Sequence, residues 1–201
     1  MIWYLAAALL GYLLGSIPFG LLLTRMGGLG DIRNVGSGNI GATNVLRTGR
    51  KDLALATLLL DGLKAGLSYM AFAMLSGDRN VGLVAGAMAF LGHCYPIWLQ
   101  FKGGKGVATY AGLLIFSFWW KVFLAGAVVW FTVFALSRIS SLAGLSAAIL
   151  VPSSAFLLGE SRFAIIVLLA LSVLVFWTHR ENIKRLLKGT EPKFGNKATG
   201  Q

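Results

Sequence analysis

Long apolar segments separated by short polar stretches constrain the fold of this chain more than any other feature. A helix needs about 20 mostly apolar residues to cross a hydrocarbon core of about 30 Å, and segments of this kind fill most of the 201 residues. The mean hydropathy is +0.76, far above that of an ordinary globular domain. The apolar segments leave no room for a separate soluble domain. The sequence therefore predicts an all-α polytopic membrane protein, with one integral-membrane domain over residues 1–190 and a disordered tail over residues 191–201.

Seven apolar runs can be distinguished, and the fourth and fifth decide the topology. Residues 107–137 are too long for one comfortable crossing and short for two. Lys121 follows Trp119 and Trp120, and this break predicts a turn between two helices. The seven transmembrane helices expected are Ile2 to Leu23, Leu53 to Leu75, Val81 to Leu99, Val107 to Phe118, Val122 to Ser137, Ser140 to Leu158 and Phe163 to Trp177.

Basic residues are distributed unequally over the loops that these helices create. The net charge of +11 is excluded from apolar segments and must lie in the loops and tail. With seven crossings, one side of the membrane receives every basic loop and tail residue except Arg79, Lys121 and Arg162. Cytoplasmic loops are enriched in Lys and Arg, so we expect the N-terminus outside and the C-terminus in the cytoplasm. Orientation in lipid thus explains the charge, and no nucleic-acid partner is expected.

The polar stretch from Asn34 to Lys51 has a composition suited to holding phosphate. It contains glycines, hydroxyls, amides and basic side chains, with no acid before Asp52. It matches G-x-G-x-x-G, but a dinucleotide site requires a βαβ unit and the flanks here are membrane helices. Glycine-rich backbone can still form an anion-binding nest, although a flexible loop with ordinary positive-inside charge is the alternative. The candidate ligands are Ser37, Gly38, Asn39, Thr43, Asn44 and Arg47.

Two further polar stretches fall on the same predicted face. Gly103, Gly104 and Lys105 precede an apolar helix, whose N-terminal amides and the lysine could hold phosphate, although a simple glycine turn is equally compatible. His179 and Asn182 are three residues apart and so share one helical face. A basic helix that only touches anionic lipid headgroups is the alternative there.

Titratable residues inside the apolar runs are few. Asp61 and Lys64 are three residues apart, and unpaired charge is expensive in a bilayer. We expect them to pair with each other or with polar groups of the site, and we favour a structural role. Cys94 is the single cysteine and is expected in the core rather than as an acyl carrier. Neither His93 nor His179 begins a His-x-x-x-x-Asp motif, and no metal site or cofactor is predicted.

Glycine pairs four residues apart recur in three of the runs. Small residues at this spacing let helices pack closely. Packing within one chain is favoured over dimerisation, so a monomer is expected. The pairs are Gly11 with Gly15, Gly62 with Gly66, and Gly82 with Gly86.

Three motifs, in order and at these spacings, closely resemble one enzyme family. They are N-V-G-S-G-N-I-G-A-T-N, G-H-C-Y-P followed by F-K-G-G-K-G-V-A-T, and H-R-E-N-I-K-R-L-L. The chain resembles the bacterial acyl-phosphate:glycerol-3-phosphate acyltransferases from Gly15 to about Leu187. The resemblance implies a seven-helix inner-membrane enzyme that moves a fatty acyl group from acyl phosphate to the sn-1 hydroxyl of glycerol 3-phosphate. The products implied are lysophosphatidic acid and phosphate, with neither acyl-CoA nor acyl carrier protein as donor.

The same resemblance implies roles for individual residues. Ser37 and Arg47 correspond to an essential pair, and Lys105, with Gly103 and Gly104, to a glycerol-phosphate loop. The third motif contributes His179 and Asn182 to the site, with Glu181 structural, and Ser141 matches a position near the substrate phosphate. A soluble enzyme that produces acyl phosphate is a further candidate partner, beside the substrates and membrane lipid.

The chemistry of acyl phosphate fits these residue types. A mixed anhydride has a good leaving group, so the protein must chiefly align two phosphorylated substrates and stabilise negative charge. Because no His/Asp dyad is present, we hypothesise that a substrate phosphate oxygen accepts the hydroxyl proton. Two readings from other classes are a transporter or channel for phosphorylated anions and an anchor for a soluble partner.

Overall fold

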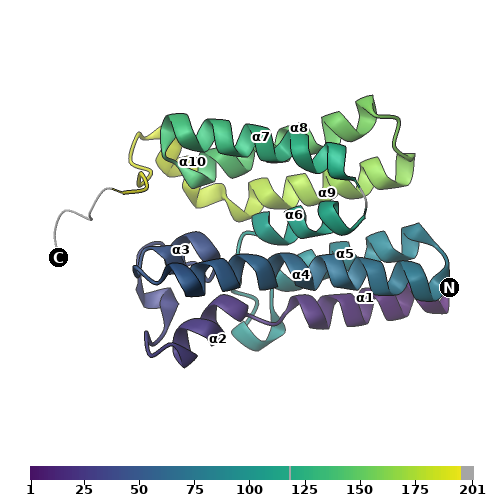
Figure 1. Cartoon of the computed structure of the whole chain (residues 1–201), viewed down its shortest axis with the longest axis horizontal. Helices are drawn as coiled ribbons and strands as arrows, with labels where there is room; N and C mark the ends of the chain where they lie inside the picture. Colours follow the sequence, from purple (N-terminus) through teal and green to yellow (C-terminus); the bar gives the residue numbers. More distant parts are fainter. Residues whose placement is uncertain (118, 196–201) are drawn as a thin grey trace. The chain divides into compact units, whose positions relative to one another are not determined.

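A computed structural model describes residues 1–117 and 119–195, and every regular element in them is helical (Figure 1). The predicted all-α class is confirmed. The chain divides into two compact units, Met1–Trp119 and Trp120–Gln201. The α-helices of the first unit are α1 (Ile2–Gly15), α2 (Phe19–Met26), α3 (Ala42–Leu46), α4 (Lys51–Ser76), α5 (Arg79–Cys94) and α6 (Val107–Phe116). Two 3₁₀ turns, η1 (Ile32–Asn34) and η2 (Ile97–Leu99), lie in its loops.

The first predicted run is broken into two helices. Pro18 lies between α1 and α2, and proline both lacks an N–H group and disfavours helical geometry at the preceding residue. Together α1 and α2 span Ile2–Met26. Figure 1 shows α2 and α3 at the end of this unit that lies away from the N-terminus.

Glycines bring the helices of the first unit into close contact, as their spacing predicted. A Cβ atom on Gly15 would lie 2.0 Å from the carbonyl oxygen of Ala89 on α5. On α4, a Cβ atom on Gly62 would lie 3.3 Å from the carbonyl oxygen of Ala108 on α6. The prediction of packing inside the chain is confirmed at these crossings.

A buried apolar cluster connects the loop after α2 to the rest of the first unit. Leu21, Ile32, Ile40 and Val45 belong to it, and each is at most 3% exposed. Leu99 of η2 packs against the same cluster. The first two predicted polar stretches are therefore attached to one core.

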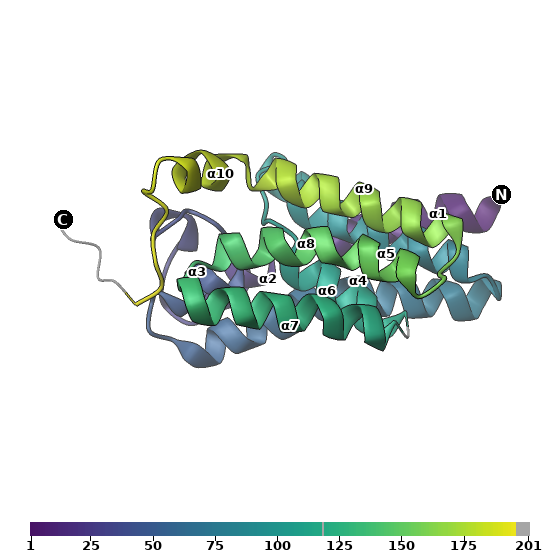
Figure 2. The same ribbon diagram turned by 90° about the horizontal axis from the view of Figure 1, so that it is seen from above.

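The second unit consists of α7 (Trp120–Ser137), α8 (Ser140–Leu157), α9 (Arg162–Thr178) and α10 (Arg180–Leu187). Helix α8 packs between α7 and α9 and runs antiparallel to both (Figure 2). Pro152 lies inside α8 without ending it. Ser161 caps α9 by accepting a hydrogen bond from the N–H of Ala164.

The described residues contain five helical segments long and apolar enough to span a membrane, or six if α9 and α10 count as one bent span. The predicted break near Lys121 exists, because α6 ends at Phe116 and α7 begins at Trp120. The 10 residues of α6 are fewer than a full crossing needs. Seven crossings and the orientation of the termini stay predictions, and the predicted disordered tail falls partly on residues 196–201, outside the described residues.

Candidate active site

The loop between α2 and α3 turns sharply around Ser37. Gly36 and Gly38 have positive φ angles of 56° and 70°, a region that other residues adopt at a cost of roughly 1–2 kcal/mol. A Cβ atom on Gly36 would also lie 2.5 Å from Oδ1 of Asn44. The glycines therefore permit a turn that leaves the side chain of Ser37 exposed.

Asn44 holds this turn together from the inside. Its side chain is buried, and its Nδ2 group donates to the carbonyl oxygens of Ile32, Val35 and Asn39 at 3.1, 2.9 and 2.8 Å. Its Oδ1 atom accepts hydrogen bonds from the N–H and the hydroxyl of Ser37 at 3.0 and 3.2 Å. Asn44 thus fixes the position of Ser37, and its predicted contact with substrate stays a prediction.

Most basic charge near this loop is neutralised locally. Arg33 pairs with Asp31 at 2.6 Å, and its hydrogen bonds hold the pKa of that carboxyl well below the usual value. Arg50 pairs with Asp52 at 2.6 Å. Among the described residues, Arg47 has no carboxylate within ion-pair distance. Arg47 is therefore the loop arginine whose charge can be used by an anionic ligand.

Arg47 also lies against the glycine turn. Its Nη1 atom is 3.1 Å from the position that a Cβ atom on Gly36 would take. The side chain is exposed, and Asn39 and Thr43 are partly exposed nearby in sequence. The structure thus brings the side chain of Arg47 against the turn that carries Ser37.

The glycine segment before α6 folds back tightly on the end of α5. The N–H groups of Gly103 and Gly104 donate to the carbonyl oxygens of Cys94 and His93 at 3.1 and 3.0 Å. These two amides are therefore used by the fold. Lys105 follows in the same segment and is half-buried. Contact of the two glycines with substrate stays a prediction.

A buried charged triad lies beneath that segment. Nζ of Lys64 is 2.9 Å from Oδ1 of Asp61, which confirms the predicted pair, and 2.8 Å from Nδ1 of His93. The same ammonium donates to the carbonyl oxygen of Ile17 at 3.1 Å. A Cβ atom on Gly104 would lie 2.1 Å from Nε2 of His93. The triad therefore supports the glycine segment directly. No spacing in the sequence indicated that His93 joins it.

In the second unit, His179 lies at a 60° bend between α9 and α10. Its ring is 2% exposed, and Nδ1 is 2.8 Å from the carbonyl oxygen of Val175. A carbonyl oxygen can only accept, so Nδ1 donates in this hydrogen bond. The bend and this hydrogen bond thus fix the place of the imidazole.

Ser141 and Asn182 are brought together by a residue that sequence reasoning missed. The hydroxyl of Ser141 and Nδ2 of Asn182 each donate to Oε1 of Glu191 at 2.6 Å. Nε of Arg185 donates to Oε2 of Glu191 at 2.7 Å. Burial alone would raise the pKa of Glu191, but these three hydrogen bonds lower it below the usual value. Glu191 belongs to none of the recognised motifs, so no pattern pointed to it.

The predicted site residues therefore form two groups. The first unit holds Ser37 and Arg47 on one turn, with Lys105 on a segment that shares its core. The second unit holds Ser141 and Asn182 around Glu191, with His179 preceding α10. The meeting of the two groups stays a prediction. Within residues 1–117 and 119–195, no group of three or more His, Cys, Asp or Glu side chains could hold a metal ion.

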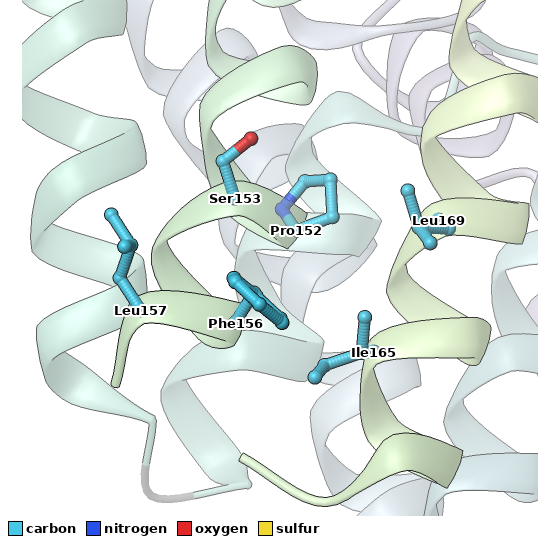
Figure 3. Close-up of a pocket in the computed structure, with 6 residues that line it drawn as sticks. All are labelled: Pro152, Ser153, Phe156, Leu157, Ile165 and Leu169. Carbon is cyan, nitrogen blue, oxygen red and sulfur yellow. The ribbon is translucent and has the colours of Figure 1, made fainter. Parts of the chain in front are cut away.

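A pocket between α8 and α9 is apolar (Figure 3). Its volume is about 400 Å³, and Ser153 is the one polar side chain that lines it. The other lining residues are Pro152, Phe156, Leu157, Ile165 and Leu169. Because the lining holds no charge, this pocket is unsuited to a phosphorylated group.

A model of the glycerol-3-phosphate acyltransferase family matches residues 5–189. This chain belongs to the glycerol-3-phosphate acyltransferase family. The match includes every predicted site residue, whereas Glu191 lies just beyond it. The predicted family is confirmed.

Similar proteins cover nearly the whole chain. Glycerol-3-phosphate acyltransferases of Hyphomonas neptunium and Maricaulis maris are 65% and 59% identical to it over 195 and 193 residues. These alignments cover 96% of this chain in both cases and 94% and 88% of the relatives.

Two solved structures are similar to the chain, both of PlsY (YgiH), an integral membrane glycerol 3-phosphate acyltransferase. The glycerol 3-phosphate form is 39% identical with a TM-score of 0.89, and covers 96% of each chain. The lysophosphatidic acid form is 37% identical with a TM-score of 0.87, over 96% of this chain and 95% of the other. Together with its apolar helices, this family membership makes the chain a multi-pass membrane acyltransferase of phospholipid biosynthesis.

Proposed function

We propose that this enzyme transfers a fatty acyl group from acyl phosphate to the sn-1 hydroxyl of glycerol 3-phosphate, giving lysophosphatidic acid and inorganic phosphate. The observation that carries the proposal is the similarity, over 96% of the chain, to structures in glycerol 3-phosphate and lysophosphatidic acid forms. Those two molecules differ by one acyl group, which is the group that such an enzyme must add. The enzyme acts in the bacterial inner membrane, and a monomer suffices for the reaction.

Acyl phosphate is the donor that best fits the residues available. Transfer to a hydroxyl from a poor leaving group needs strong general acid–base help, whereas phosphate leaves a mixed anhydride readily. The chain has no His-x-x-x-x-Asp dyad. It instead presents Arg47 without a carboxylate partner among the described residues, beside Ser37 on a glycine turn. Such groups bind phosphate and stabilise negative charge.

The reaction then proceeds by direct acyl transfer. The sn-1 oxygen attacks the acyl carbon, a C–O ester bond forms, and the bond between the acyl carbon and the phosphate oxygen breaks. The phosphate leaves with the electron pair and one of its oxygens takes the hydroxyl proton. Arg47 and Lys105 neutralise the phosphates, Ser37 and Asn182 donate hydrogen bonds, and Gly38, Asn39, Thr43, Asn44, Gly103, Gly104 and Ser141 complete the substrate-binding surface.

Substitution of His179 tests whether the substrate phosphate takes the hydroxyl proton. The Nδ1 atom of His179 donates to the carbonyl oxygen of Val175, so a general-base role would fall to Nε2. This role is the direct competitor of the substrate-assisted step. We expect His179→Ala to lower kcat without abolishing it, because the phosphate still accepts the proton. A fall to the uncatalysed rate in a folded variant that still binds glycerol 3-phosphate would identify His179 as the base.

The proposal requires seven crossings, with the N-terminus outside and the tail in the cytoplasm. The loop and tail charges favour this arrangement, and the break between α6 and α7 supplies the extra turn. Under this topology the glycine turn, the segment before α6 and helix α10 face the same leaflet. Both groups of site residues can then contact one pair of phosphorylated substrates.

The decisive assay uses purified protein in detergent with acyl phosphate and labelled glycerol 3-phosphate. We expect labelled lysophosphatidic acid from acyl phosphate and none from acyl-CoA offered in parallel. Product formed without a sealed membrane would also exclude a purely transport role. Product from acyl-CoA alone would refute the proposed donor. An anchor for a soluble partner would leave the rate unchanged in Arg47→Ala.

A further inference from the structure

The carboxylate of Glu191 fills a small polar site in the second unit. Its Oε1 atom accepts from Ser141 at the start of α8 and from Asn182 on α10, each at 2.6 Å. Its Oε2 atom pairs with Nε of Arg185 at 2.7 Å, and the carboxylate side chain is only 7% exposed. A hydroxyl, an amide N–H and a guanidinium therefore converge on one anion.

The segment that carries Glu191 is held at a second point. The N–H of Phe194 donates to the carbonyl oxygen of Arg138 at 2.7 Å, and the ring of Phe194 lies 5.9 Å from that of Phe134 on α7. In Figure 2, the yellow segment after α10 runs from that helix toward the end of α7. We call residues 191–195 the strap. It crosses the start of α8, where Ser141 lies.

The site beneath the strap keeps one polar atom without a partner. Asn182 is 4% exposed, and its Oδ1 atom has no hydrogen-bond partner among the described residues. The orientation of the amide is fixed, because a carboxylate accepts only from the Nδ2 side. Oδ1 therefore offers a buried acceptor beside the anion, which a ligand hydroxyl would satisfy and Glu191 does not.

The three donors suit a phosphate group better than a carboxylate. A phosphate monoester carries more negative charge and three acceptor oxygens, so it can engage the hydroxyl, the amide and the guanidinium at once. It cannot do so while the carboxylate occupies the same donors. The strap has two attachments, at Arg138 and at these donors, and the second is lost when Glu191 is displaced.

We propose that Ser141, Asn182 and Arg185 form one phosphate subsite and that Glu191 of the strap occupies it until a substrate phosphate displaces the carboxylate. This inference rests on the proposed function and adds Arg185 as a ligand and the strap as an internal competitor. The apparent Kd for the substrate then equals the intrinsic Kd divided by the fraction of molecules whose strap is open. If Glu191 instead positions Asn182 for catalysis, removal of its charge should weaken phosphate binding rather than tighten it.

The test uses the full-length protein in detergent and the variant Glu191→Gln, which keeps the shape and removes the charge. Binding of inorganic phosphate is measured by titration calorimetry, and KM is measured separately for glycerol 3-phosphate and for acyl phosphate. If the strap is closed in about nine molecules of ten, phosphate binds about tenfold more tightly to the variant. The substrate whose KM falls by a similar factor is the one whose phosphate enters the subsite.

Three further variants make the result decisive. Removal of residues 191–201 should tighten phosphate binding as Glu191→Gln does. This truncation replaces Glu191→Gln in the test if the glutamine variant does not fold. In the Glu191→Gln background, Arg185→Met should weaken phosphate binding, because a ligand is lost and no carboxylate remains to be displaced. Glu160→Gln removes a carboxylate from the α8–α9 connection, away from the strap, and should change nothing.

Phosphate binding that is equal or weaker in Glu191→Gln, in a chain that still transfers acyl groups, would overturn the inference. Weaker binding with lower kcat would make Glu191 a positioning residue for Asn182. If instead the wild-type chain makes no lysophosphatidic acid from acyl phosphate, the proposed function fails, whatever the calorimetry shows.

Discussion

At the scale of single residues, Arg47 differs from the other arginines of its loop in lacking a carboxylate partner among the described residues. We predict that Arg47→Lys lowers kcat/KM by about tenfold to a hundredfold, since hydrogen bonds to a charged group contribute roughly 1.5–3 kcal/mol and lysine cannot bind an anion bidentately. Arg50→Lys is the matched control, because Arg50 is paired with Asp52 at 2.6 Å. Equal losses in both variants would mean that loop charge in general, rather than Arg47, serves the reaction.

Gly104 gives a second prediction at this scale. A Cβ atom there would lie 2.1 Å from Nε2 of His93, and His93 is fixed by Lys64 at 2.8 Å. In Gly104→Ala the segment before α6 must shift, at a cost of about 1–3 kcal/mol in the free energy of unfolding. We expect activity to fall by about a hundredfold, because a misplacement of about 1 Å can lower the rate by that factor. Wild-type activity with an unchanged Tm would contradict this.

At the scale of elements, the strap couples the tail to α8 and α10 through a charge. Hydrogen bonds to Ser141, Asn182 and Arg185 lower the pKa of Glu191 below its ordinary value of 4.5, against the opposing effect of burial. A lowered pKa means that the ionised carboxylate stabilises the fold above the ordinary value, and that this stabilisation disappears as pH falls through the lower native value.

The difference in Tm between wild type and Glu191→Gln should therefore be constant from neutral pH down to about pH 5 and vanish in stronger acid. Thermal unfolding followed by circular dichroism at several pH values measures it. Glu160→Gln, compared in the same way, should show no such difference. A Glu191→Gln difference that does not change with pH would mean that the contact does not depend on the carboxylate charge.

For the whole molecule, local signals predicted the elements, and long-range contacts account for what they missed. Apolar runs predicted the helices because helix length is set by the bilayer, and the three-residue spacing predicted the pair of Asp61 with Lys64. His93 joins that pair from another helix, which no spacing reveals. Glu191 reaches Ser141 only because the chain turns back after α10. Asn44, a predicted ligand, forms its hydrogen bonds inside its own loop.

The number of crossings is the property of the whole molecule on which the proposed site depends. Helix α6 rises only ~15 Å over its 10 residues, about half of the hydrocarbon core, so it must extend through adjoining residues to cross. If it does, Lys121 lies outside and Lys188 in the cytoplasm. If residues 107–137 cross once, Lys188 lies outside, and α10 cannot share a face with the glycine turn.

Single cysteines in a Cys94→Ala background distinguish these arrangements. We predict that Lys121→Cys in intact cells reacts with a membrane-impermeant maleimide, whereas Lys51→Cys and Lys188→Cys react only after the membrane is opened. Labelling of Lys188→Cys in intact cells would place Asn182 and Arg185 on the opposite side from Arg47. No single pair of phosphorylated substrates could then contact all three residues, so this one position decides whether the two groups of site residues can form one active site.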